Sequence, residues 1–143
     1  MRKPDQVFLS FAHADRAGAA EIAAGLSEAG MKVWADMRLQ GDPNWVADIE
    51  HAIMNSDVFL PLVTPDFASS EWVLYELGFI MGEQRVRHAP VLPVLLRTSR
   101  IPLILRPFHL IDASRQPLDQ AIPAIVDAVI QAWAKAAPAS TAA

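Results

Sequence analysis

The sequence predicts a doubly wound α/β domain, in which helices cover both faces of a five-stranded parallel sheet. Short apolar runs alternate with longer segments in which apolar residues recur at helical spacing. The chain has 143 residues, of which 52% are hydrophobic, and this is enough for one domain with a core. Strands that alternate with helices favour a parallel sheet, because each helix returns the chain to the edge where the previous strand began.

The first part of the chain predicts two strands and the helix between them. Residues 7–11 (VFLSF) form an apolar run that is typical of a buried strand. Asp15 is expected to cap an alanine-rich helix, and Gly30 is expected to end it as the residue after the C-cap. Residues 31–34 (MKVW) predict the second strand.

A polar loop over residues 35–41 precedes the second predicted helix. Asp42 and Pro43 have the pattern of an N-cap followed by a proline at the first helical position. Apolar residues then recur at helical spacing through residues 45–53. Residues 57–63 (DVFLPLV) predict the third strand.

The remaining residues predict two helices and two strands. After a loop over residues 64–69, a helix is expected to begin at Ser70. Residues 90–96 and 108–111 predict the last two strands, and residues 118–133 predict a final amphipathic helix. Prolines inside the third and fourth strands argue against regular pairing there; they are Pro61 and Pro93.

Five such strands favour the flavodoxin-like order 2-1-3-4-5, with the ligand site at the carboxyl ends of the strands. The site is therefore expected in the loops after Phe11, Trp34 and Val63. Residues 1–136 are assigned to this domain. The low-complexity residues 137–143 are assigned to a linker or disordered tail, which could lead to a further domain.

Composition and charge argue against several classes of protein. The chain has no cysteine, and its four histidines do not have metal-ligand spacing. A net charge of −4 argues against nucleic acid as a partner. Residues 1–84 carry −8 and residues 85–143 carry +4, which favours contact between opposed faces of two copies. The longest apolar run is too short to cross a membrane and the first residues do not resemble a secretory signal, so a cytoplasmic location is expected.

Common ligand motifs of this fold class are missing from the sequence. It contains no G-x-G-x-x-G, no P-loop and no nucleophile elbow. Residues 11–13 (FAH) follow the first strand, where a receiver domain needs an acidic pair, and Asp66 lies beyond the third strand in a predicted loop. Gly78 and Gly82 lie one helical turn apart and are expected to allow close packing.

Trp72 and Glu76 are the most informative pair in the chain. They lie four residues apart in the helix expected from Ser70, so both side chains occupy one face. Apolar residues flank Glu76, and a partly desolvated glutamate at the ligand edge of the sheet is a candidate functional group. The alternative is that Trp72 packs in the core and that Glu76 is an ordinary exposed glutamate.

Four segments resemble the boxes of Toll/interleukin-1 receptor (TIR) domains. Residues 7–15 (VFLSFAHAD) resemble the first box, and residues 30–34 (GMKVW) resemble the second strand. Residues 42–56 and 65–77 resemble patterns of bacterial members, the last of them ending in S-x-W-x-x-x-E-L. The order and spacing of the boxes extend the likeness over about residues 7–111.

The resemblance implies a role for Glu76. Many TIR domains of bacteria and plants cleave NAD+ between nicotinamide and ribose, and their catalytic glutamate corresponds to Glu76; NAD+ is then a substrate, and no cofactor is expected. Residues 35–43 correspond to the BB loop, which gates the site and mediates contacts between TIR domains. Its expected assembly residues are Asp36, Arg38 and Asp42. The expected substrate-binding residues are Phe11, Ala12, Asp36, Trp45, Trp72 and Tyr75.

This reading predicts a bacterial NAD+ glycohydrolase or cyclase that acts in defence or virulence and releases ADP-ribose or cyclic ADP-ribose. Its expected partners are NAD+ and other TIR domains in head-to-tail contact, with no membrane and no directly bound nucleic acid. One departure is that many relatives have tyrosine or a hydroxyl residue where this chain has Phe11 and Ala12. Two alternatives stay open: a non-catalytic TIR adaptor, and an enzyme similar to nucleoside deoxyribosyltransferases, which also use a glutamate at an N-glycosidic bond.

Overall fold

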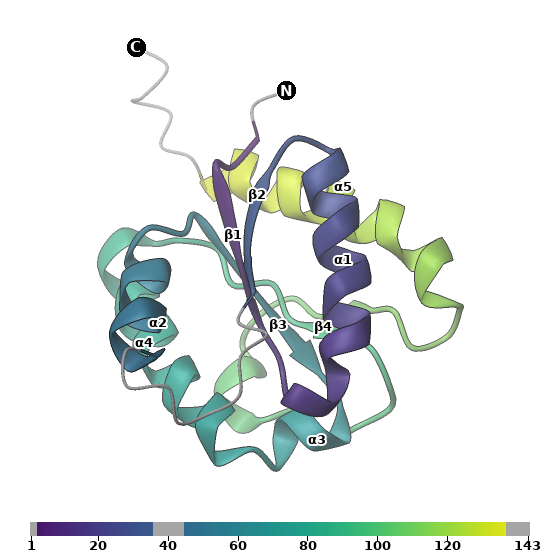
Figure 1. The fold of residues 1–143 in the computed structure, drawn as a ribbon, viewed down its shortest axis with the longest axis horizontal. Helices are drawn as coiled ribbons and strands as arrows, with labels where there is room; N and C mark the ends of the chain where they lie inside the picture. The colour runs from purple at the N-terminus through teal and green to yellow at the C-terminus, as the bar shows by residue number, and fades with distance from the viewer. Residues whose placement is uncertain (1–2, 36–44, 137–143) are drawn as a thin grey trace.

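The computed structural model describes residues 3–35 and 45–136, apart from the side chains of Trp45, Val46, Glu71, Trp72 and Leu74. In this part of the chain five parallel strands form one sheet in the order β2-β1-β3-β4-β5 (Figure 1). The predicted fold class and strand order are confirmed. The strands are β1 (Gln6–Ser10), β2 (Lys32–Ala35), β3 (Val58–Val63), β4 (Val94–Leu95) and β5 (Ile111–Asp112).

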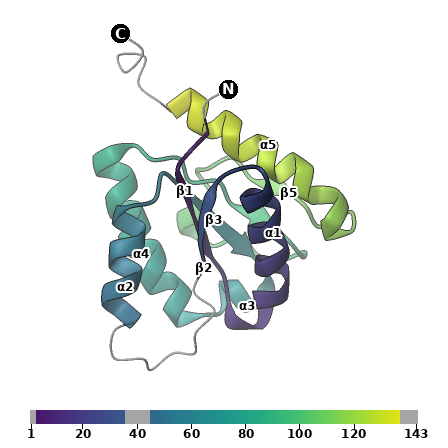
Figure 2. The same cartoon turned by 45° about the horizontal axis from the view of Figure 1, so that its top comes forward.

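Helices cover both faces of the sheet, as predicted. Two of them, α1 and α5, lie on one face, and α2 and α4 lie on the other (Figure 2). None of the described helices is long and apolar enough to span a membrane. The long helices are α1 (Arg16–Glu28), α2 (Trp45–Met54), α4 (Glu71–Arg87) and α5 (Leu118–Ala136), and the short ones are η1 (His13–Asp15), α3 (Pro65–Ala68) and η2 (Leu103–Leu105).

The sheet divides the core into two layers. Val7 and Leu9 of β1 pack against α1 and α5, whereas Phe8 packs in the layer of α2 and α4. Successive side chains of a strand point to opposite faces, so Ser10 faces the same layer as Phe8. This alternation decides which β1 residues can meet α4.

Gly30 ends α1, as predicted. It has a φ of +95°, a left-handed conformation that glycine adopts without steric cost. The Gly30 amide donates to the Ser27 carbonyl at 3.0 Å, and the Met31 amide donates to the Leu26 carbonyl at 3.1 Å. These two bonds make a Schellman motif, which satisfies carbonyls at the end of the helix.

The prediction of a loop over residues 64–69 is wrong. This segment contains α3, and the Thr64 side-chain oxygen accepts a hydrogen bond from the Phe67 amide at 3.1 Å. Pro65 occupies the first helical position, where its missing N–H costs nothing. Thr64 and Pro65 therefore begin a short helix, which lies between β3 and α4.

The prolines interrupt the pairing of β3 with β4. Phe59 and Val63 of β3 form backbone hydrogen bonds to the fourth-strand segment, and Pro61 between them has no N–H to donate. Regular pairing in β4 is therefore confined to two residues instead of the predicted run over residues 90–96. The fifth strand is also short and begins at Ile111 rather than at residue 108.

The close packing expected at Gly78 and Gly82 occurs at another glycine. A Cβ atom on Gly25 of α1 would overlap Cγ2 of Ile122 in α5, so only glycine fits there without movement. A Cβ atom on Gly78 or Gly82 would meet no atom within 4 Å. The prediction for these two glycines is therefore wrong within the domain.

Candidate active site

Glu76 lies on the inner side of α4, and only 4% of its surface is exposed. The residues that share this side of the helix, Val73, Leu77 and Ile80, are apolar and buried. The Ser70 side-chain oxygen caps the helix by accepting a hydrogen bond from the Val73 amide at 3.3 Å. The reading of Glu76 as an ordinary exposed glutamate is thus contradicted. A buried glutamate at the ligand edge of the sheet is a candidate functional group.

Ser10 and Ala12, at the end of β1, face the core layer that also contains the inner side of α4. Ala12 packs in the core cluster that contains α4 residues Leu77 and Ile80. Ser10 faces that layer by strand alternation, and its buried hydroxyl has no hydrogen-bond partner among the described residues. An unsatisfied buried hydroxyl is unusual in a folded protein. The sequence analysis did not select Ser10 as a site residue; its place at the carboxyl end of the first strand was the available signal.

Trp34 adds an aromatic ring to this side of the sheet. It belongs to β2 and stands opposite Phe8 of β1 in the strand register. The two rings are stacked, with centroids 5.1 Å apart and planes 8° apart. Trp34 is only partly buried and lies next to the last residue of β2. A planar group could therefore stack at this edge beside the Glu76 layer.

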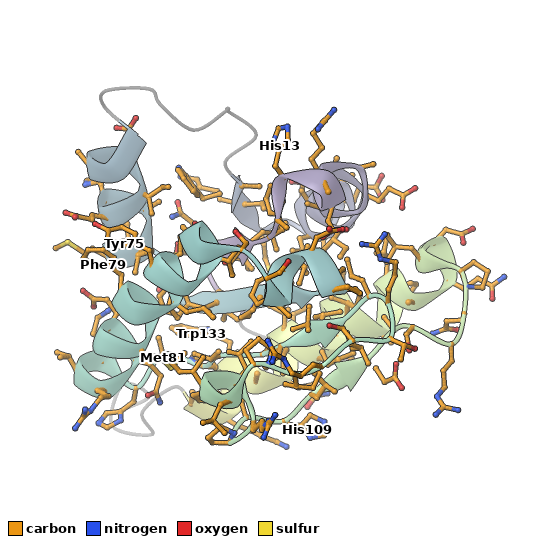
Figure 3. All side chains as sticks on the ribbon, turned by 90° about the horizontal axis from the view of Figure 1, so that it is seen from below. His13, Tyr75, Phe79, Met81, His109 and Trp133 are labelled. Carbon is orange, nitrogen blue, oxygen red and sulfur yellow. The ribbon has the colours of Figure 1, made fainter. Side chains whose placement is uncertain are left out.

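Two residues predicted to bind substrate do not face Glu76. Phe11 packs in the opposite layer, with α1 and α5. Tyr75 is 43% exposed and lies on the outer side of α4. Its ring meets that of Phe79 edge to face, with centroids 5.0 Å apart (Figure 3). Of the predicted residues with described side chains, only Ala12 shares the buried layer of Glu76.

The other predicted residues fall partly or wholly outside the described structure. Trp72 lies one turn before Glu76 in α4, and Trp45 is the first residue of α2, but neither side chain is among those described. Asp36, Arg38 and Asp42 lie outside the described residues altogether. Their predicted roles in substrate binding and assembly stay predictions.

A second polar cluster joins the ends of three strands. Asp15 occupies the N-cap position of α1, as predicted, but its side chain makes no capping hydrogen bond. Its buried carboxylate instead accepts hydrogen bonds from the Thr64 hydroxyl and from the Arg97 guanidinium, the latter at 2.8 Å. Arg97 also pairs with Asp66 at 3.1 Å. This network ties the loops after β1, β3 and β4 together.

A hollow of about 300 Å³ adjoins this network. Its lining includes Gly18 at the start of α1, Leu96 after β4 and Gln116 before α5. It lies on the α1 and α5 side, so the sheet separates it from Glu76. Within residues 3–35 and 45–136, no group of three His, Asp or Glu side chains is placed to hold a metal ion.

Comparison with known proteins gives a family and a set of similar folds. The family model for the TIR domain matches residues 7–126 of the chain. None of the curated proteins matches the chain. The TIR domain of the Toll-related receptor TRR-2 from Hydra magnipapillata is 21% identical, with a TM-score of 0.70 over 87% of this chain and 97% of that one.

Two other solved structures extend the comparison. The RPS4 and RRS1 TIR domain heterodimer is 15% identical to this chain, with a TM-score of 0.68 over 89% of this chain and 97% of that one. The CMP N-glycosidase BcmB from Clostridium botulinum is 16% identical, with a TM-score of 0.60 over 84% of this chain and 96% of that one. At these identities the likeness establishes a shared fold alone.

Proposed function

Because the chain belongs to the TIR domain family, we propose that it cleaves the bond between nicotinamide and ribose in NAD+, with Glu76 as the catalytic residue. The observation that carries this proposal is the burial of Glu76 on the inner side of a helix that begins at the ligand edge of the sheet. Buried ionisable side chains at a ligand edge are frequent among catalytic groups.

The reaction is one that a single carboxylate can serve. Most glycosidases need a second acid to protonate the leaving group. Nicotinamide in NAD+ is a cationic pyridinium, so the electron pair of the broken C1′–N bond neutralises it and no proton is required. Glu76 would stabilise the positive charge that develops on the ribosyl carbon and orient the ribose hydroxyls. Water then adds to C1′ and loses a proton to give ADP-ribose, or a nucleophilic atom of the same molecule closes a cyclic product.

Other residues around Glu76 fit a nucleotide substrate. The unsatisfied hydroxyl of Ser10 can donate or accept a hydrogen bond to a ribose hydroxyl. The partly buried indole of Trp34 offers a surface on which a planar base can stack. NAD+ is the proposed substrate without any cofactor, and head-to-tail contacts through the loop over residues 35–43 are the proposed mode of activation.

A non-catalytic adaptor is the second candidate. It is favoured by the TIR domain heterodimer among the similar structures. It does not explain why a carboxylate is buried in α4. A third candidate acts on another N-glycosidic bond, since a nucleotide N-glycosidase shares the fold.

Measuring which substrate the purified protein cleaves distinguishes the three candidate functions. NAD+, CMP and free nucleosides are each incubated with the protein over a range of protein concentrations, and the products are separated by chromatography. We expect nicotinamide release from NAD+, and a loss of about 100-fold or more in Glu76→Gln, because the variant keeps the shape and loses the charge. Glu83→Gln is the matched control, because Glu83 lies in the same helix and makes a surface ion pair with Arg87.

Two results would overturn the proposal. The first is near wild-type turnover in a folded Glu76→Gln variant, as judged by circular dichroism. The second is no NAD+ cleavage at any protein concentration while the chain still self-associates, which would favour the adaptor. Cleavage of CMP or nucleosides in place of NAD+ would assign the third function.

A further inference from the structure

The hollow beside the Asp15–Arg97 network has the position and size of a second binding site. It lies at the carboxyl edge of the sheet, where open α/β sheets bind their ligands. Its lining includes residues that follow four strands: Asp15 after β1, Thr64 after β3, Leu96 after β4 and Ala113 after β5. Its volume of about 300 Å³ is at the lower end of the range for small-molecule sites, so a ligand of one or two rings would fit.

The walls of the hollow are largely apolar. Leu96 and Leu118 contribute partly buried side chains, and Ala113 is buried. Gly18 contributes no side chain, and a Cβ atom there would lie 3.6 Å from a methyl carbon of Leu96 and 3.6 Å from one of Leu118. Because all three residues line the hollow, a side chain longer than alanine at position 18 would occupy part of it. Apolar walls with a few polar groups are the usual composition of a small-molecule site.

The Asp15–Arg97 pair presents a hydrogen-bond acceptor beside a donor. Oδ1 of Asp15 lies 2.8 Å from Nη2 of Arg97, and both residues line the hollow. Among the described residues, Arg97 bonds to Asp15 and Asp66 through Nη2 alone, so its Nε and Nη1 are left to donate to a ligand. The Asp15 carboxylate accepts two hydrogen bonds and has lone pairs for more. A ligand with a donor next to an acceptor could therefore bond to both residues at once.

These polar groups are held in place by the domain itself. The buried Asp15 carboxylate accepts a hydrogen bond from the Thr64 hydroxyl, which fixes its orientation. The Arg97 side chain is 56% exposed, but Asp15 and Asp66 hold it from two different loops. Binding to groups that are already ordered costs less conformational entropy than ordering them on binding. The site is thus largely formed before a ligand enters.

Charge disfavours an anionic ligand in the hollow. Two carboxylates, Asp15 and Asp66, are paired with the single guanidinium of Arg97, so the cluster carries one more negative charge than positive charges. Gln116, another polar residue of the lining, is uncharged. The carboxylates of the cluster would repel a further carboxylate or phosphate, whereas an uncharged ligand avoids this repulsion.

We propose that this hollow binds an uncharged heteroaromatic ring that carries an N–H donor next to an acceptor. The carboxamide of nicotinamide and the amino edge of adenine both have this pattern. The ligand N–H would donate to Asp15, and its carbonyl oxygen or ring nitrogen would accept from Arg97. The ring would pack against Leu96 and Leu118. This binding does not depend on NAD+ cleavage, because the sheet separates the hollow from Glu76.

Nuclear magnetic resonance of the isotope-labelled whole chain tests both the binding and its location. Nicotinamide and 9-methyladenine are titrated separately, which shows which of the two rings the site prefers. We expect saturable shifts of the backbone amides of Gly18, Leu96 and Ala113, with a dissociation constant of about 1 mM for the preferred ring. Nicotinate and the N6,N6-dimethyl derivative of 9-methyladenine are the matched control ligands. The first is an anion and the second lacks the N–H, so each should bind about tenfold more weakly or worse.

Substitutions within the hollow separate specific binding from weak contact with the surface. Gly18→Leu should abolish binding, whereas Gly18→Ala should retain it, because the added methyl group would meet its neighbours at an ordinary contact distance. Arg97→Met should weaken binding about tenfold or more, and Arg85→Met, at the exposed end of α4, should leave it unchanged. The same spectra show whether each variant is folded.

Three outcomes would each overturn the proposal. They are the lack of saturable shifts with both rings, equal binding by Gly18→Leu and the unaltered chain, and shifts confined to the Glu76 layer, for example at Ala12 and Leu77. Glu76→Gln should bind the ring as the unaltered chain does. A failure of the proposed NAD+ cleavage would therefore leave this result intact, and a failure of binding in the hollow would leave NAD+ cleavage intact.

Discussion

Gly25→Ala tests whether α1 and α5 approach each other as closely as the structure indicates. The new Cβ atom would overlap Cγ2 of Ile122, a partly buried residue of the core layer beneath these helices. Ile122 is β-branched, so it has few rotamers with which to yield. The substitution therefore forces the helices apart or moves Ile122 off its rotamer.

The expected size of the effect combines two opposing contributions. Overpacking of a well-packed core costs about 1–3 kcal/mol. The higher helix propensity of alanine raises the free energy of unfolding by about 0.5–1 kcal/mol. The central values of the two contributions, about 2 and about 0.75 kcal/mol, leave a net loss of about 1 kcal/mol in the free energy of unfolding, which corresponds to a fall of about 2–4 °C in melting temperature for a domain of this size. Gly82→Ala, which meets open space, should raise the melting temperature by about 1–4 °C.

Thermal and urea unfolding of both variants measure these opposite signs. A double-mutant cycle sharpens the test, because Ile122→Ala removes the atom that the new methyl group would meet. On that background Gly25→Ala should stabilise the domain instead of destabilising it. A Gly25→Ala variant of the unaltered chain that is stabilised as much as Gly82→Ala would refute the close approach of α1 and α5.

Two further substitutions test the polar groups at the carboxyl edge of the sheet. Asp15→Ala should lower the free energy of unfolding by about 1–3 kcal/mol in urea, because the Thr64 hydroxyl and the Arg97 guanidinium lose their acceptor; no measurable loss would contradict the network. Ser10→Ala removes a hydroxyl that has no partner, so it should leave the free energy of unfolding unchanged or raise it, while slowing NAD+ cleavage. An unchanged rate of cleavage would remove Ser10 from the proposed site.

The elements that the sequence predicted correctly depend on local patterns. The strand order followed from the alternation of strands and helices, and the end of α1 followed from one glycine in a left-handed conformation. The helix that carries Glu76 was predicted to begin at Ser70, which is its N-cap in the structure. The missed helix α3 also had a local signal, since Thr64 and Pro65 form a cap and a first helical residue.

The other errors concern contacts between residues that are distant in the sequence. Asp15 has the residue type of an N-cap, but Thr64 and Arg97, which come from two other loops, bind its carboxylate instead. Helical spacing shows that a glycine faces one side of a helix but does not show what lies opposite. For this reason Gly25 could not be distinguished from Gly78 before α5 was placed in space.

The distribution of apolar residues on α4 explains why the side that faces the core was hard to predict from the sequence. A helix at the surface of a domain normally has one apolar stripe and one polar face, whereas a helix that is apolar all round is buried. On α4, Leu77 and Ile80 face the core, but Tyr75, Phe79 and Val86 face outward. Helical spacing alone therefore could not show which of these two apolar sides the domain buries, because that depends on where the sheet and α2 lie.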